Sequence, residues 1–176
     1  MIATYFPGSQ STGYGEAEGF TYSNGVYTPL NDPLGIYGTE LDAINGNDIV
    51  GSYNDNSGSH GFVFNGTSFQ TIDDPLAAVA TNVTGISGDV IVGNYDGGKG
   101  FIDVDGTFTS PTIPGASGSV FIAGISGNQI VGSYTDSNDV SQSFVATIPE
   151  PSTFALLVLG GLVLCITRRV IPRYIT

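Results

Sequence analysis

The sequence repeats itself, and this repetition restricts the chain to a small group of folds. Similar segments begin about 40 residues apart, namely AINGNDIVGSY at Ala43, GISGDVIVGNY at Gly85 and GISGNQIVGSY at Gly124. A second landmark recurs at the same spacing: GFTYSNGVY at Gly19, GFVFNGTSF at Gly61, GFIDVDGTF at Gly100 and a partial SFVAT at Ser143. Two landmarks that recur in the same order indicate an array of similar structural units.

Each unit predicts four short antiparallel strands. In the second unit, Gly61–Asn65 and Ser68–Ile72 flank Asn65-Gly66, a dipeptide that supplies the positive φ angles of a type I′ hairpin turn. Strands around Thr81–Ser87 and over Val90–Tyr95 complete the unit. The equivalent turn dipeptides are Asn24-Gly25 and Asp105-Gly106, and the turns between third and fourth strands are expected at Gly46, Gly88 and Gly127. The continuous apolar Ile-Val-Gly core is typical of a strand that is covered on both faces.

These features predict an all-β domain over residues 1–147, made of units at about 19–60, 61–99 and 100–142 with partial units at both ends. A four-stranded unit of about 40 residues suits a blade of a β-propeller, which typically has roughly 4–8 blades. The chain supplies about 3.5 units, so the propeller is expected to be incomplete or open. Three explanations would fit this incomplete number of units: a longer gene upstream, two chains that combine, or an open array whose strand edges self-associate. The start inside a unit, without the features of a signal peptide, favours the first.

The charge is segregated along the chain. The net charge is −12, from 16 acidic and 4 basic residues, and all of the acidic residues lie at or before Glu150. Lys99 is the only basic residue before that point. Because such an acidic surface repels phosphate backbones, nucleic-acid binding is not expected. The single cysteine, Cys165, excludes an intrachain disulfide.

The repeats resemble a known sequence family. The pattern Gly-Ile-Ser-Gly-x-x-Ile-Val-Gly-x-Tyr, followed by Gly-Phe and an Asn/Asp-Gly turn, is similar to the HAF repeats of bacterial extracellular proteins over most of residues 1–147. The resemblance implies a secreted, β-rich protein and supplies no catalytic residues.

No catalytic constellation is visible in the sequence. His60 is the only histidine, and it occupies a position where other units have Glu18, Lys99 and Gln142. It is therefore expected to be a solvated loop residue, because a base or metal ligand would need partners that the sequence does not show. Carboxylates such as Asp103 and Asp105 simply alternate along a strand into a turn, so no acidic pair stands out from the repeat pattern. We expect no enzymatic activity and no cofactor.

Two further sets of residues are weak candidates for binding. Asp55, Asp96 and Asp136 lie in equivalent acidic turns and could ligate calcium. None fits the spacing of a twelve-residue calcium loop, and the same residues are ordinary turn formers. The recurring tyrosines could stack on sugar rings in a carbohydrate-binding module, although repeated aromatics more often fill a core; they are Tyr53, Tyr95 and Tyr134.

The last residues contain an apolar run between a proline-rich triplet and a basic cluster. Pro151 suits the first turn of a helix and Pro172 blocks its continuation, which predicts a transmembrane helix over residues 152–171. Twenty residues of helix span about 30 Å, the thickness of a hydrocarbon core. The cluster of Arg168, Arg169 and Arg173 is expected on the cytoplasmic side, which places residues 1–150 outside the cytoplasm.

Residues 148–176 closely resemble the PEP-CTERM sorting signal of Gram-negative bacteria. The matching elements are Pro149-Glu150-Pro151, Ser152-Thr153, the apolar run and Arg168-Arg169. The resemblance implies processing by an exosortase near the triplet, with release to or attachment at the cell surface, often alongside exopolysaccharide production. The stretch VIPRYIT extends beyond the arginine pair, where such tails usually stop.

The sequence thus predicts a non-enzymatic protein of the cell surface or extracellular matrix. It is expected to be sorted by an exosortase, anchored to the membrane through its C-terminal helix, and linked to exopolysaccharide or biofilm. A lectin-like module is the alternative, and a glycan-processing enzyme is a more remote one.

Overall fold

A computed structural model describes residues 1–5 and 17–149. These residues form fourteen β-strands and no helix, which confirms the predicted all-β class. The contact pattern separates Met1–Ala146 from Thr147–Thr176, and the fold described below belongs to the first of these units.

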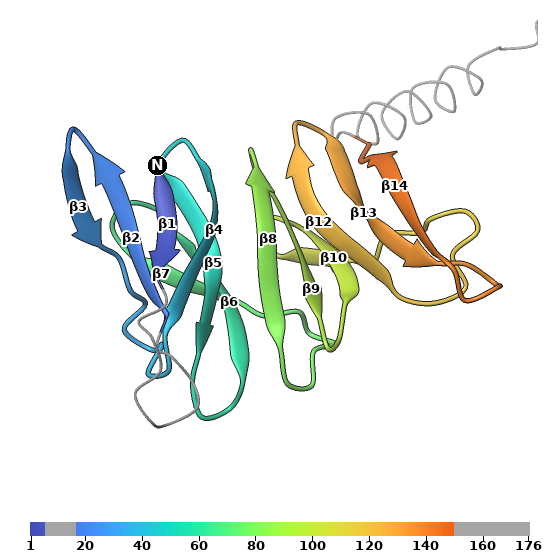
Figure 1. Ribbon diagram of the computed structural model, residues 1–176, viewed down its shortest axis with the longest axis horizontal. Coiled ribbons are helices and arrows are strands. Elements are labelled where there is room, and N and C mark those ends of the chain that lie inside the picture. Colours follow the sequence, from blue (N-terminus) through green and yellow to red (C-terminus); the bar gives the residue numbers. More distant parts are fainter. Residues whose placement is uncertain (6–16, 150–176) are drawn as a thin grey trace, which may run out of the picture. The chain divides into compact units, whose positions relative to one another are not determined.

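The strands form four separate antiparallel sheets in chain order (Figure 1). The first sheet contains β1 (Ile2–Tyr5), β2 (Glu18–Ser23) and β3 (Val26–Pro29). The second contains β4 (Thr39–Asn45), β5 (Asp48–Asn54), β6 (Ser59–Phe64) and β7 (Phe69–Ile72). The third contains β8 (Thr81–Ser87), β9 (Val90–Tyr95), β10 (Lys99–Val104) and β11 (Thr107–Thr109). The fourth contains β12 (Val120–Ser126), β13 (Gln129–Thr135) and β14 (Ser141–Thr147).

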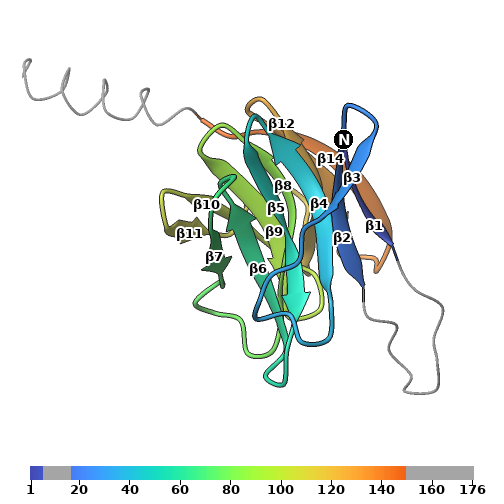
Figure 2. The same ribbon diagram turned by 90° about the vertical axis from the view of Figure 1, so that its left-hand side faces the viewer.

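Each sheet packs on the next one along the chain. Strands β1 and β2 of the first sheet contact β4 of the second. Strands β4, β5 and β6 of the second sheet contact β8 of the third, and strands β8, β9 and β10 of the third contact β12 of the fourth. Figure 2, viewed from the side of the first sheet, shows the successive sheets one behind another. The described residues do not close into a propeller. Each sequence unit is divided between two sheets, because its Gly-Phe hairpin completes one sheet and its last two strands begin the next.

Most of the predicted turns are present, with one exception. Asn24-Gly25 and Asp105-Gly106 have positive φ at both residues, as a type I′ turn requires. At Asn65-Gly66 only the glycine has positive φ, so the predicted type I′ turn is wrong. Instead, Asn65 Oδ1 accepts hydrogen bonds from the N–H groups of Thr67 and Ser68, at 3.0 and 2.9 Å, which forms a wider loop between β6 and β7.

The repeated Ile-Val-Gly glycine is required by close packing within each sheet. A Cβ atom at this position would collide with a carbonyl oxygen of the preceding strand and with the phenylalanine ring that covers the glycine from the following strand. The three glycines and their rings are Gly51 with Phe62, Gly93 with Phe101, and Gly132 with Phe144. The phenylalanine compensates for the missing side chain by packing over the exposed backbone.

The Gly-Phe glycine has a different task, which is to let neighbouring sheets approach each other. A Cβ atom here would lie within 2.9 Å of a side chain on the first strand of the next sheet. The pairs are Gly19 with Leu41, Gly61 with Val83, and Gly100 with Ile122. The two glycines of the repeat therefore serve packing within a sheet and packing between sheets, respectively.

Polar side chains also join neighbouring sheets. Thr4 Oγ1 accepts a hydrogen bond from the backbone N–H of Leu41 at 2.8 Å. At the equivalent position of the third sheet, Asn94 accepts from the N–H of Ile122 and donates to its carbonyl oxygen, both at 2.8 Å. Each bonded residue lies beside a β-bulge, where the sheet ladder is interrupted. The side chain from the previous sheet thus satisfies backbone groups that the bulge releases.

Candidate functional site

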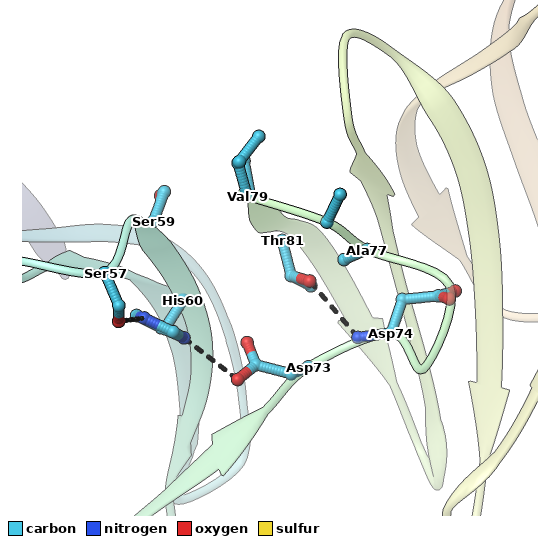
Figure 3. Close-up of a pocket in the computed structure, with 10 residues that line it drawn as sticks. Ser57, Ser59, His60, Asp73, Asp74, Ala77, Val79 and Thr81 are labelled. Carbon is cyan, nitrogen blue, oxygen red and sulfur yellow. Dashed lines mark hydrogen bonds and ion pairs between the residues drawn. The ribbon is translucent and has the colours of Figure 1, made fainter.

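The site with the most chemistry in the described structure is a small cavity beside His60, where the second sheet meets the segment leading to the third (Figure 3). Its volume is about 170 Å³. Its lining includes Ser57, Ser59, His60, Asp73, Val79 and Thr81. The β5–β6 turn supplies Ser57, β6 supplies Ser59 and His60, and the chain that follows β7 supplies Asp73.

Both ring nitrogens of His60 have polar partners. Nδ1 lies 2.9 Å from Asp73 Oδ2, and Nε2 lies 2.9 Å from Ser57 Oγ and 3.3 Å from Asp55 Oδ1. The ring also stacks on Tyr53 of the neighbouring strand, with centroids 5.1 Å apart. The sequence-based expectation of a solvated loop residue is wrong, because His60 lies on β6 and is only partly exposed.

The surrounding carboxylates favour the imidazolium form. Burial alone would lower the pKa of His60, but the hydrogen bond and charge of Asp73, together with the charge of Asp55, outweigh this effect and raise it above 6.5. Asp55 accepts hydrogen bonds from the Ser57 hydroxyl and from backbone N–H groups, which lower its pKa to about 2. While His60 is protonated, the cluster is a network of ion pairs joining the β5–β6 turn to the segment after β7.

The order serine, histidine, aspartate resembles that of a catalytic triad, but the geometry differs in two respects. The Ser57 hydroxyl donates to Asp55 Oδ1 at 2.6 Å, so its proton is not directed to His60. The N–H groups of Ser57 and Gly58 also bond to Asp55, and those of residues 78–80 bond to Asp96. Among the described groups around the cavity, these N–H donors are not free to form an oxyanion hole. The arrangement suits a structural ion-pair network better than acyl transfer.

Replacing His60 with glutamine tests this interpretation. The folded-state pKa of His60 lies above its unfolded value of about 6.5. Its contribution to stability is therefore complete below about pH 6.5 and is lost as the pH rises through the folded-state pKa. The free energy of unfolding of the wild type is thus expected to exceed that of His60→Gln by up to about 1 kcal/mol at pH 5.5 and by less at pH 8.5. Urea unfolding of both full chains checks this, since titrating groups that the two chains share cancel in the difference. An equal difference at both pH values contradicts the ion-pair assignment.

The three aspartates considered for calcium each stabilise a separate turn. Asp55 bonds as described above, and Asp96 accepts from three consecutive N–H groups, of Ala78, Val79 and Ala80, at 2.7–3.2 Å. Asp136 accepts from the N–H groups of Asn138 and Val140. These bonds lower the pKa values of Asp96 and Asp136. Within the described residues no group of three or more His, Cys, Asp or Glu side chains is placed to hold a metal ion.

The recurring tyrosines lie mainly in the cores between sheets. Tyr53 and Tyr95 are 3% and 7% exposed, and Tyr134 is partly buried. A ring with so little exposed area cannot stack on a sugar without rearrangement, so the glycan-contact interpretation of Tyr53 and Tyr95 has no support here. Core packing, the alternative considered from sequence, accounts for their position.

The sequence reasoning missed one pair of buried polar contacts. The backbone N–H groups of Asp32 and Asp74 donate to the Oγ1 atoms of Thr39 and Thr81, at 3.0 and 3.1 Å. All four residues are buried, and each aspartate carboxylate also accepts from the N–H group two residues later. The repeated Asp-Pro-Leu at Asp32 and Asp74 is the signal that could have revealed them.

Comparison with known proteins identifies one feature of the chain. Residues 147–169 match the family model described as the PEP-CTERM protein-sorting motif. No curated protein and no solved structure matches the chain. The match contains Pro149, Glu150, Pro151, Arg168 and Arg169, and it confirms the predicted sorting signal; Arg173 lies beyond it.

The chain therefore combines an all-β array with a PEP-CTERM sorting motif. The motif indicates export, exosortase-dependent sorting and association with the membrane or cell surface of a Gram-negative bacterium. The described part of the chain has no helix able to cross a bilayer. The transmembrane helix predicted over residues 152–171 lies outside the described residues. The comparisons do not support the HAF resemblance of the repeats.

Proposed function

We propose that this chain is a non-enzymatic protein of the cell surface or extracellular matrix, which an exosortase recognises and processes at its C-terminal signal. The match over residues 147–169 carries the proposal. Processing near Pro149–Pro151 would separate the β-sheet array from the apolar run, and would release the array or transfer it to the cell surface.

Two properties of the array fit such a role. It is strongly acidic, which favours solubility outside the cell and disfavours nucleic acid as a partner. The cavity beside His60 is bordered by an ion-pair network and does not offer the free donors of a substrate pocket. Association with exopolysaccharide or biofilm is part of the proposal, and any lectin-like activity would have to use residues other than the buried Tyr53 and Tyr95.

Replacing Pro149, Glu150 and Pro151 with alanine tests the proposal in a Gram-negative host that carries an exosortase. We expect the wild type, expressed from its own gene, to lose mass at its C-terminus and to accumulate in the envelope or medium. The alanine variant should keep its full mass and stay in the membrane fraction. Mass spectrometry of fractionated cells gives both results.

The double variant Pro111→Ala/Pro114→Ala, in the loop after β11, is a matched control that should be processed normally. A host without its exosortase should leave the wild type unprocessed. Recovery of the wild type only from the cytosol, or equal processing of the triplet variant, overturns the proposal.

A further inference from the structure

The interfaces between sheets show what covers each face of a repeat sheet. In the interface between the second and third sheets, Val50 packs with Phe101, and Val63 and Phe108 pack against the same core. The second sheet contributes Val50 and Val63, and the third sheet contributes the rings of Phe101 and Phe108 together with Val83 and Ile86 of β8. At this interface, therefore, the face with Val50 and Val63 is covered by a face of the next sheet that carries aromatic rings.

The fourth sheet presents such a face without a cover among the described residues. Val131 is equivalent to Val50 and Val92, which are completely buried, yet it is 43% exposed. Val145 is equivalent to Ile102, which is 8% exposed, yet it is 67% exposed. These differences arise only because no described sheet follows the fourth one. We define Phe121, Val131 and Val145 as the valine face.

The first sheet presents the complementary aromatic face, formed by Phe20, Tyr22 and Tyr27. Its geometry reproduces that of Phe62, Phe64 and Phe69 in the second sheet. The Phe20–Tyr27 and Phe62–Phe69 pairs are both edge-to-face, with centroids 5.4 and 5.2 Å apart and the same 66° angle. The Tyr22–Tyr27 and Phe64–Phe69 pairs lie at 4.6 and 4.7 Å.

The two aromatic sets differ in their surroundings. Phe62, Phe64 and Phe69 belong to the core between the first and second sheets. Tyr27, the equivalent of Phe69, is 64% exposed. The first sheet therefore carries an aromatic face of the kind that is packed elsewhere in the chain.

We propose that the valine face of one copy binds the aromatic face of a second copy, so that the sheet array continues from chain to chain. The contacts of Val131 with Phe20 and of Val145 with Tyr27 would reproduce those of the interface between the second and third sheets. The association is head-to-tail, because the two faces lie on different sheets. It uses sheet faces rather than the open strand edges considered from sequence. It is independent of the sorting signal and of the proposed function.

Net charge sets the conditions under which the copies associate. Each copy carries a net charge of −12, so two copies repel each other at low salt. Apolar contacts between the faces persist at high salt, where the repulsion is screened. Association is therefore expected to strengthen as salt is added, in contrast to an interface built from ion pairs.

Cross-linking between differently labelled chains tests the geometry. Two full-length forms are prepared in detergent in a Cys165→Ser background, one with Val145→Cys and the other with Tyr27→Cys. A short bismaleimide should join the two forms efficiently when they are mixed. Val145→Cys alone should give little cross-linked dimer, because valine faces do not meet each other.

Cross-linking of Val145→Cys with itself as efficient as in the mixture overturns the head-to-tail proposal. A mixture that yields no dimer at high salt also overturns it. If the chains associate only through the apolar tail, the mixture and each form alone should give the same yield of cross-linked dimer, which also contradicts the proposal.

Substitution of the valine face gives a second, independent readout. Val131→Lys/Val145→Lys should weaken self-association about tenfold or more, measured by sedimentation at high salt. Val140→Lys, at an exposed valine in the β13–β14 turn, is the control and should associate as the wild type does. Equal association of both variants overturns the proposal, and circular dichroism confirms that each variant is folded.

Discussion

Gly51→Ala should lower the free energy of unfolding by about 3 kcal/mol or more, whereas Gly124→Ala should change it by less than about 1 kcal/mol. Both glycines lie in β-strands of the repeat, and alanine is usually tolerated better than glycine inside a strand. The opposite outcome at Gly51 follows from its surroundings. An added Cβ would collide with the carbonyl oxygen of Glu40 and lie 3.0 Å from the ring of Phe62.

The collision at Gly51 involves the backbone of the paired strand, which cannot move without breaking the β4–β5 ladder. At Gly124 no atom lies within 4 Å of the added Cβ. Its equivalent in the second sheet is Ala43, so the fold already accepts a methyl group there. Gly124→Ala is therefore a control for the residue change itself.

Urea unfolding of the full chains in detergent, monitored by circular dichroism, measures both effects. If Gly51→Ala proves as stable as Gly124→Ala, the Ile-Val-Gly glycine is not required by packing, and the account of the repeat given above is wrong. If Gly51→Ala does not fold at all, the expected direction is confirmed and Gly93→Ala, with the same type of collision in the third sheet, can be measured instead.

Phe101→Ala is expected to cost about 3–5 kcal/mol, the usual range for truncating a fully buried phenylalanine. Its ring is completely buried and packs with Val50, Val83 and Phe108 between the second and third sheets. It also covers Gly93, so its loss would expose backbone as well as leave a cavity. The backbones on both sides of that space are held by sheet hydrogen bonds, so neighbouring side chains would fill it only in part.

Phe144→Ala provides the matched comparison in the fourth sheet. Phe144 covers Gly132 as Phe101 covers Gly93, but it is only partly buried. Its truncation should therefore cost clearly less than that of Phe101, because less apolar area is lost from the core. Chemical denaturation of the two variants side by side gives the comparison. Equal costs would show that burial between sheets does not set the stability of the repeat.

The fold was largely predictable because its determinants are local and repeated. Asn24-Gly25, Asp105-Gly106 and the turn glycines act through backbone conformation, which depends on a few adjacent residues. Asn65-Gly66 contains a similar dipeptide but forms a different turn. Its Asn65 side chain bonds to Thr67 and Ser68 and so competes with the tight hairpin.

The site around His60 was not predictable from sequence. Ser57 and Asp55 lie close to His60 in the chain, but Asp73 reaches it only because β6 and β7 form a hairpin. A single histidine with no recurring motif carries no signal of such partners. The same limit applies to Tyr53 and Tyr95, whose spacing alone does not distinguish a core position from an exposed one.

The sequence by itself determined the β-repeat character, the turn positions and the sorting motif at residues 147–169. These features depend on short stretches of chain, where composition and spacing are sufficient. Only the tertiary structure decided how the strands are grouped into sheets, which glycine serves which contact, and which carboxylates surround His60. It also decided that Val131 is exposed while Val50 is buried, because burial depends on which sheet comes next and not on the residue itself.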